Sequence, residues 1–131
     1  MPAKGYKNLS IYRKAAELQT MSRAIAVCVN SNGKEVVQAR RSDSLREQVA
    51  GSILRDAALI RKQVALAAST PSLSIRQSSL HFIQIMIRNL NSYCKGLEMD
   101  GVREREYLEL MRQEIKGFRR TFMQWRNSLG N

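Results

Sequence analysis

The apolar residues at the C-terminal end of the chain recur at the spacing of a helix with one buried face. Between residues 107 and 129 they fall alternately three and four residues apart, a heptad pattern that keeps one stripe turned toward packed neighbours. This heptad stripe consists of Leu108, Met111, Ile115, Phe118, Phe122, Trp125 and Leu129. We therefore predict a helix from Tyr107 to Leu129, with Trp125 as a core anchor in preference to a base-stacking platform.

Two more helices are predicted from the first half of the chain. The first covers residues 9–28 and ends at 30–33, where Asn and Gly tolerate the left-handed backbone that closes helices. The second begins at Ser44, which opens a capping box, or earlier near Lys34, and it ends near Ser69. Its predicted buried positions are Leu45, Val49, Ile53, Ala57, Ile60, Val64 and Ala67.

The remaining helix is predicted to begin at Thr70-Pro71 and to end at Gly96, with Asp100-Gly101 capping the start of the last helix. Its apolar surface is wider than a single stripe, because three large apolar residues lie beyond it. A helix with so wide an apolar surface is expected to pack against two partners, one of them a second subunit. The predicted interface residues are Phe82, Ile85 and Met86.

Four helices joined by short connections predict an all-α fold, an antiparallel up-down-up-down four-helix bundle. Residues 1–8 are expected to be a flexible basic lead-in, and 9–131 to form a single domain. Cys28 and Cys94 both lie on apolar helix faces without a CxxC motif, so we expect reduced, buried thiols and a cytoplasmic protein. No run of 18 apolar residues is present, so no membrane partner is expected.

The charge of the chain is strongly positive. Lys and Arg number 22 against 11 Asp and Glu, a net charge of +11, which favours a polyanionic partner such as RNA or DNA. Four arginines spaced seven residues apart follow the heptad stripe of the last helix, and further basic residues widen this flank. The predicted phosphate contacts are Arg105, Arg112, Lys116, Arg119, Arg120 and Arg126, with Arg13, Lys14, Arg40 and Arg41 as secondary candidates. The alternative is a solvated basic border beside a core.

Groups for catalysis are not apparent in the sequence. The only histidine, His81, is interpreted as a structural or solvated side chain. The chain has no Gly-rich phosphate loop and no inward Glu-x-x-His pairs of the kind that bind metals in helical bundles. We therefore predict a protein that is not an enzyme and that needs no cofactor and no metal.

Three stretches resemble one family of small bacterial four-helix-bundle proteins. YKNLSIYRKAAELQTMSRAI (6–25) is similar to the family's first helix, and SLREQVAGSILRDAALI (44–60) to its second. The family includes proteins encoded in intervening sequences of 23S ribosomal RNA genes and the accessory variability determinant (Avd) of diversity-generating retroelements. The chain departs from the first branch, with Ser52-Ile53-Leu54-Arg55 in place of its Ser-Ile-Pro signature. FRRTFMQWRNSLGN (118–131) is more similar to the Avd branch.

The resemblance implies a homopentameric barrel with a basic surface. It also implies an accessory role without catalysis, in which the protein binds a reverse transcriptase and nucleic acid to support mutagenic copying of a template RNA. The alternative is a basic helical module, like the intervening-sequence proteins, with an acidic protein partner. Sequence alone leaves open whether the nucleic acid is RNA, DNA or a hybrid.

Overall fold

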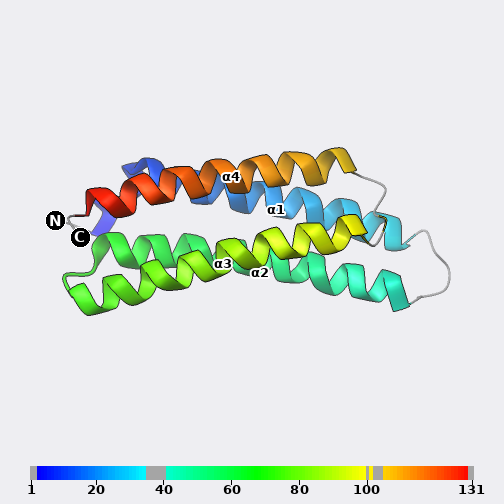
Figure 1. Cartoon of the computed structure of the whole chain (residues 1–131), viewed down its shortest axis with the longest axis horizontal. Helices are drawn as coiled ribbons and strands as arrows, with labels where there is room; N and C mark the ends of the chain where they lie inside the picture. Colours follow the sequence, from blue (N-terminus) through cyan, green and yellow to red (C-terminus); the bar gives the residue numbers. More distant parts are fainter. Residues whose placement is uncertain (1–2, 35–40, 100, 102–104, 130–131) are drawn as a thin grey trace.

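The computed structural model describes residues 3–34, 41–99, 101 and 105–129. These residues form a short 3-10 helix and four long α-helices, with no strand among them. The elements are η1 (Ala3–Asn8), α1 (Ser10–Lys34), α2 (Arg41–Ser69), α3 (Leu73–Met99) and α4 (Arg105–Ser128). The prediction of an all-α chain with four helices is confirmed over this part of the chain. Successive helices run in opposite directions along the bundle (Figure 1).

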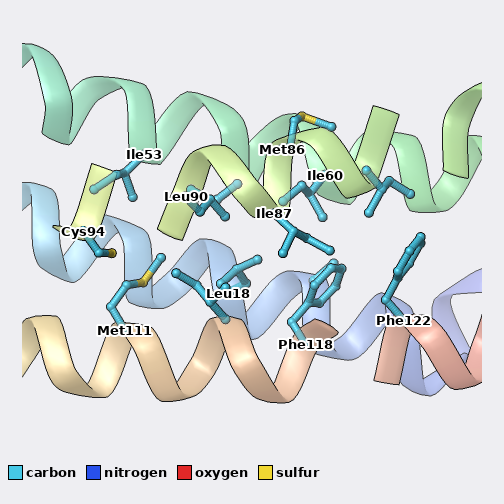
Figure 2. Close-up of a cluster of buried hydrophobic side chains, with 14 of the residues drawn as sticks. Leu18, Ile53, Ile60, Met86, Ile87, Leu90, Cys94, Met111, Phe118 and Phe122 are labelled. Atoms are coloured by element: carbon cyan, nitrogen blue, oxygen red, sulfur yellow. The ribbon is translucent and has the colours of Figure 1, made fainter. Parts of the chain in front are cut away.

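Each long helix packs on two others. α1 packs on α2 and α4, and α3 packs on the same two helices, so that the four surround one core. The core consists almost entirely of aliphatic, Met and Phe side chains, and Figure 2 shows Phe118 and Phe122 of α4 pointing into it. Both rings are fully buried, and they stack with their centroids 6.3 Å apart. Burial of these two rings fixes which face of α4 remains outside.

The heptad stripe of α4 faces the core, as predicted. Its first five members are buried, and Trp125 and Leu129 pack against the core while remaining partly exposed. α2 differs from the prediction at its N-terminal end, because Leu45 is 54% exposed and Ala50 is buried in its place. Steps of four residues rotate the face by about 40° each on a helix of 3.6 residues per turn, so Leu45 lies well off the face of Ile53.

Two predicted helix ends are wrong, and both helices continue past a glycine. α1 extends through residues 30–33 to Lys34, and α3 continues through Gly96 to Met99. A glycine inside a helix costs only about 1 kcal/mol, and burial of Leu97 one residue later outweighs that cost for α3. The left-handed residue is Gly101, with φ of 79°, and its N–H donates to the carbonyl of Glu98.

The three predicted interface residues of α3 do not all lie on its exposed side. Phe82 and Ile85 of α3 are 44% and 41% exposed, as the interface prediction requires. The prediction that Met86 is an exposed interface residue is wrong, because Met86 lies on the core side of α3 and is only 2% exposed. The described part of the basic lead-in, Ala3–Asn8, is helical and packs against α1 and α2.

Some predicted residues fall where the structure gives no side chain. Arg40 lies outside the described residues. Arg41 begins α2 and Cys28 lies within α1, but the side chains of both are outside the described part of the structure. Cys94 is buried with a free thiol. None of the described helices is long and apolar enough to cross a membrane.

Candidate nucleic-acid interface

A depression between α3 and α4 collects basic side chains from both helices. It has a volume of about 450 Å³ and is lined by Asn91, Lys95, Glu109, Arg112, Gln113, Lys116 and Arg119. Four of these seven residues carry positive charge and one carries negative charge. We call this depression, with its extension along α4, the basic groove.

The extension of the basic groove lies on α4 alone. A second depression of about 430 Å³ is lined by Lys116, Arg119, Arg120, Met123, Gln124 and Asn127. It shares Lys116 and Arg119 with the first depression, so the two are continuous. Among the described residues that line it, none is acidic. The sequence of α4 explains this bias, because residues 115–129 contain four Lys or Arg and no Asp or Glu.

The arginine row is positioned by the core stripe next to it. Because Arg112 and Arg119 each follow a buried stripe residue, the helix directs them toward α3. Arg112 extends across to α3, where its Nη2 donates to Oε1 of Glu98 over 3.3 Å. Arg119 is exposed and forms no ion pair with the described residues, so its charge faces solvent.

The six primary candidates are not all brought together. Arg112, Lys116, Arg119 and Arg120 line the basic groove, whereas Arg105 and Arg126 lie toward the two ends of α4 and outside its lining. Lys95 of α3 is a groove residue that sequence reasoning missed. The helical period contains the signal, because Lys95 lies four residues after Asn91 and three before Glu98, on the side of α3 that faces α4.

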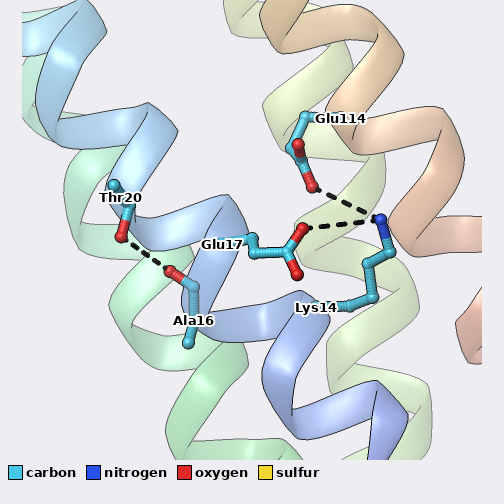
Figure 3. Close-up of polar contacts among 5 residues, drawn as sticks. All are labelled: Lys14, Ala16, Glu17, Thr20 and Glu114. Atoms are coloured by element: carbon cyan, nitrogen blue, oxygen red, sulfur yellow. Dashed lines mark hydrogen bonds and ion pairs between the residues drawn. The ribbon is translucent and has the colours of Figure 1, made fainter.

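The secondary candidates on α1 lie elsewhere. Lys14 sits at the contact of α1 with α4, where its Nζ is 3.5 Å from Glu17 and 4.0 Å from Glu114 (Figure 3). Its charge is therefore balanced by two carboxylates within the protein. Arg13 is exposed on α1 and forms no ion pair with the residues that the structure describes. Neither residue lines the basic groove.

On the opposite side of the bundle, a basic residue of α2 is also committed to internal contacts. Arg61 donates from Nε to the hydroxyl of Tyr12 and from Nη1 to Oε1 of Gln19, and its guanidinium lies 5.3 Å from the centre of the Tyr12 ring. These contacts join α2 to α1. A basic side chain on α1 or α2 is thus not by itself part of an anion-binding surface.

The core of the bundle contains a described thiol, that of Cys94 on α3, which stays protonated. Burial raises the pKa of Cys94 to about 11, Arg112 opposes this shift, and Glu98 adds to it. A thiol with so high a pKa is a poor nucleophile at neutral pH, because the thiolate is the reactive form. Within the described residues, no three His, Cys, Asp or Glu side chains come together as a metal site.

Comparisons with known proteins give no relative. No family model matches the chain, and no curated protein and no solved structure matches it.

Proposed function

We propose that this protein binds nucleic acid through phosphate contacts in the basic groove and acts without catalysis of its own. The observation that supports the proposal is the convergence of Lys95, Arg112, Lys116 and Arg119 on one depression whose lining includes a single acid. Two helices hold these cations at a fixed spacing, so successive phosphates of a strand can meet them without reordering the backbone.

Affinity in such a groove comes from neutralising phosphates and releasing the cations condensed on the strand. The described lining contains no aromatic side chain, so the groove has no surface on which a base could stack. Recognition by charge and shape follows, and RNA and DNA strands are both expected to bind in the groove itself.

The test is the removal of three groove charges against the removal of three charges elsewhere. The groove variant carries Lys116→Gln, Arg119→Gln and Arg120→Gln, which spares the Arg112 pair with Glu98. Its matched control carries Arg13→Gln, Arg23→Gln and Lys62→Gln, all exposed positions on α1 and α2. Fluorescence anisotropy with a labelled single strand should show a loss of about tenfold or more for the groove variant and much less for the control. Equal losses would contradict the assignment of the groove.

The biological role that we propose is that of a retroelement accessory subunit. In this proposal the protein binds a reverse transcriptase together with its template RNA or the copied DNA, and supports mutagenic retrohoming in the cytoplasm. The resemblance of residues 6–25 and 118–131 to Avd proteins supports it. Co-purification with the reverse transcriptase encoded beside the gene would support the role, and the absence of any such neighbouring gene would contradict it.

Assembly into a homo-oligomer, a pentameric barrel, is part of the same proposal. Its support is a set of exposed apolar side chains on the outer sides of α2 and α3, namely Leu66, Ile75, Phe82 and Ile85. A monomer gains nothing from exposing them, whereas contact with a second copy would remove them from water. Light scattering that gives a clean mass of 14.9 kDa at micromolar concentration would contradict this assembly.

The second candidate function is binding of an acidic protein. It is favoured by the same lack of aromatic side chains in the basic groove, because clustered carboxylates attract Lys and Arg as phosphates do. A competition experiment decides between the two functions. A labelled single strand is bound to the protein and then displaced either by an acidic polypeptide or by the unlabelled strand. Displacement at a far lower concentration of the acidic polypeptide than of the unlabelled strand would favour the protein partner.

A further inference from the structure

A separate depression opens at the end of the bundle where four elements meet. It has a volume of about 700 Å³, and its lining comes from η1, the end of α2, the start of α3 and the end of α4. Figure 1 shows these elements together at one end of the molecule. We call it the end pocket, and its lining residues include Tyr6, Leu9, Thr70, Arg76, Trp125 and Leu129. Its size is within the range of about 300–1,000 Å³ that is usual for small-molecule sites.

The aromatic side chains of the end pocket are held in place by the fold. Trp125 is partly exposed and leans on the buried ring of Phe122, with the centroids 6.3 Å apart. Tyr6 packs edge-on against Tyr12 at 5.0 Å. Both rings therefore line the pocket without being free to collapse into it. Flat aromatic surfaces held in this way suit a planar ligand, because little conformational freedom is lost when the ligand stacks.

The polar side of the end pocket is also fixed. Arg76 donates from Nε to the carbonyl of Ala67 and from Nη2 to the carbonyl of Thr70, which satisfies the open carbonyls at the end of α2. The hydroxyl of Ser72 accepts from the N–H of Ile75 and caps α3. A guanidinium is thus held beside the two aromatic residues, and no acid is among the described lining residues.

The end pocket is connected to the basic groove through a chain of shared residues. A small depression between α1 and α4 is lined by Leu9, Ser10, Ile11, Thr121, Gln124 and Trp125. It shares Gln124 with the basic groove, and it shares Leu9 and Trp125 with the end pocket. A strand that leaves the groove at Gln124 therefore meets the ring of Trp125 next.

We propose that the end pocket holds an unpaired base of a single strand whose phosphates lie along α4. This inference rests on the proposed function, because the basic groove supplies the phosphate contacts that bring the strand to the pocket. Trp125 and Tyr6 provide stacking surfaces, and Arg76 provides a cation beside them. Stacking on aromatic rings tolerates any base, so the pocket distinguishes single strands from duplexes and leaves sequence unread.

The first test uses the fluorescence of Trp125, the only tryptophan of the chain. Three labelled probes of equal length are compared: a single-stranded oligo(U), an abasic strand with the same phosphates, and a blunt duplex. All three should raise the anisotropy of the label, since all three carry phosphates. Only oligo(U) should quench Trp125. Binding of oligo(U) without quenching beyond that of the abasic strand would overturn the end-pocket proposal. Absence of any anisotropy change would overturn the proposed function as well.

The second test removes the ring. Trp125→Leu should weaken oligo(U) binding by roughly 5- to 100-fold, the loss of one stacked base, and should leave abasic-strand binding unchanged. Tyr107→Leu is the matched control, because Tyr107 is an exposed aromatic residue at the other end of α4. If Trp125→Leu lowers the melting temperature of the protein, Tyr6→Leu replaces it as the test, because Tyr6 lines the same pocket but lies in η1 and not in a long helix. Equal affinity of Tyr6→Leu, Tyr107→Leu and the parent for oligo(U) would overturn the proposal.

Discussion

Charged residues lie along both edges of α4, where it packs on α1 and on α3, but in different arrangements. On the edge that faces α1, the ammonium group of Lys14 lies near the carboxylates of both Glu17 and Glu114, so two negative charges surround one positive charge. On the edge that faces α3, four basic side chains share a depression with Glu109. Among the described residues, Arg112 is the one of these four that forms an ion pair, with Glu98. The α1 edge balances its charge within the protein, whereas the α3 edge has positive charge in excess.

This difference shows that a net charge of +11 does not locate a binding surface. Lys14 and Arg61 are basic residues that join helices, whereas Lys116 and Arg119 form no ion pair within the described part of the chain. The structural edge should therefore respond in stability when it is changed, and the basic groove should respond in binding.

The largest effect is expected from the core that supports both edges. Phe122→Ala should lower the free energy of unfolding by about 3–5 kcal/mol, because the ring is fully buried and leaves a cavity. Chemical denaturation measures this loss. Phe82→Ala is the control, since Phe82 is exposed in the monomer; an equal loss for both variants at a concentration where the protein is monomeric would mean that the core is assigned wrongly.

A smaller effect separates the two edges directly. Lys14→Gln should lower the free energy of unfolding by about 1 kcal/mol, because it leaves the carboxylate of Glu114, only 19% exposed, without its charged neighbour. Arg119→Gln should change stability by less than about 0.5 kcal/mol, as is usual for an exposed site. Urea melts of the two variants compare them, and the opposite order would contradict the distinction between the edges.

The smallest effect concerns an acid at the α2–α3 contact. Burial raises the pKa of Asp56 above its ordinary 3.8, while a hydrogen bond to Asn89 and the charge of Arg55 oppose the shift. Its Oδ2 is buried without a hydrogen-bond partner. Because of the raised pKa, the folded protein binds the proton of Asp56 more tightly than the unfolded chain does, so protonation stabilises the fold. This stabilisation is present in full below pH 3.8 and is lost as the pH rises through the folded pKa.

Asp56→Asn is therefore expected to be more stable than the parent at pH 7 and equal to it below pH 3.8. Thermal melts over this pH range provide the measurement. A variant that is less stable than the parent at neutral pH would show that the Asp56 carboxylate is stabilised by its neighbours more than burial disfavours it.

The spacing of apolar residues predicts the number of helices and the buried face of α4, because burial of large side chains at regular spacing is the main contribution to the stability of each helix in the bundle. It predicts the ends of α1 and α3 poorly, since residues 30–33 and Gly96 cost too little to stop helices that neighbouring residues continue. Met86 shows a related limit: one sequence position fits both an outer face and the core, and only the packing of α2 against α3 decides.

The candidate site was predictable only along a single helix. The arginine spacing in α4 indicates Arg112 and Arg119, but α3 supplies Lys95, and the sequence of α4 does not show which face of α3 lies opposite. The end pocket could not be predicted from the sequence, because its lining comes from four elements, η1, α2, α3 and α4, that are distant in the sequence. Trp125 was correctly placed on the heptad stripe, yet its partial exposure depends on where the bundle ends.

We propose that the excess positive charge of the basic groove, and not the net charge of the whole chain, binds the strand. The direct measurement is the slope of log binding constant against log salt concentration for the parent, the groove variant (Lys116, Arg119 and Arg120 to Gln) and the control (Arg13, Arg23 and Lys62 to Gln). Each lost phosphate contact removes about 0.7 units of slope for a single strand, so the groove variant should lose about 2 units and the control close to none. Equal changes in both slopes would show that the whole surface binds and would contradict the account.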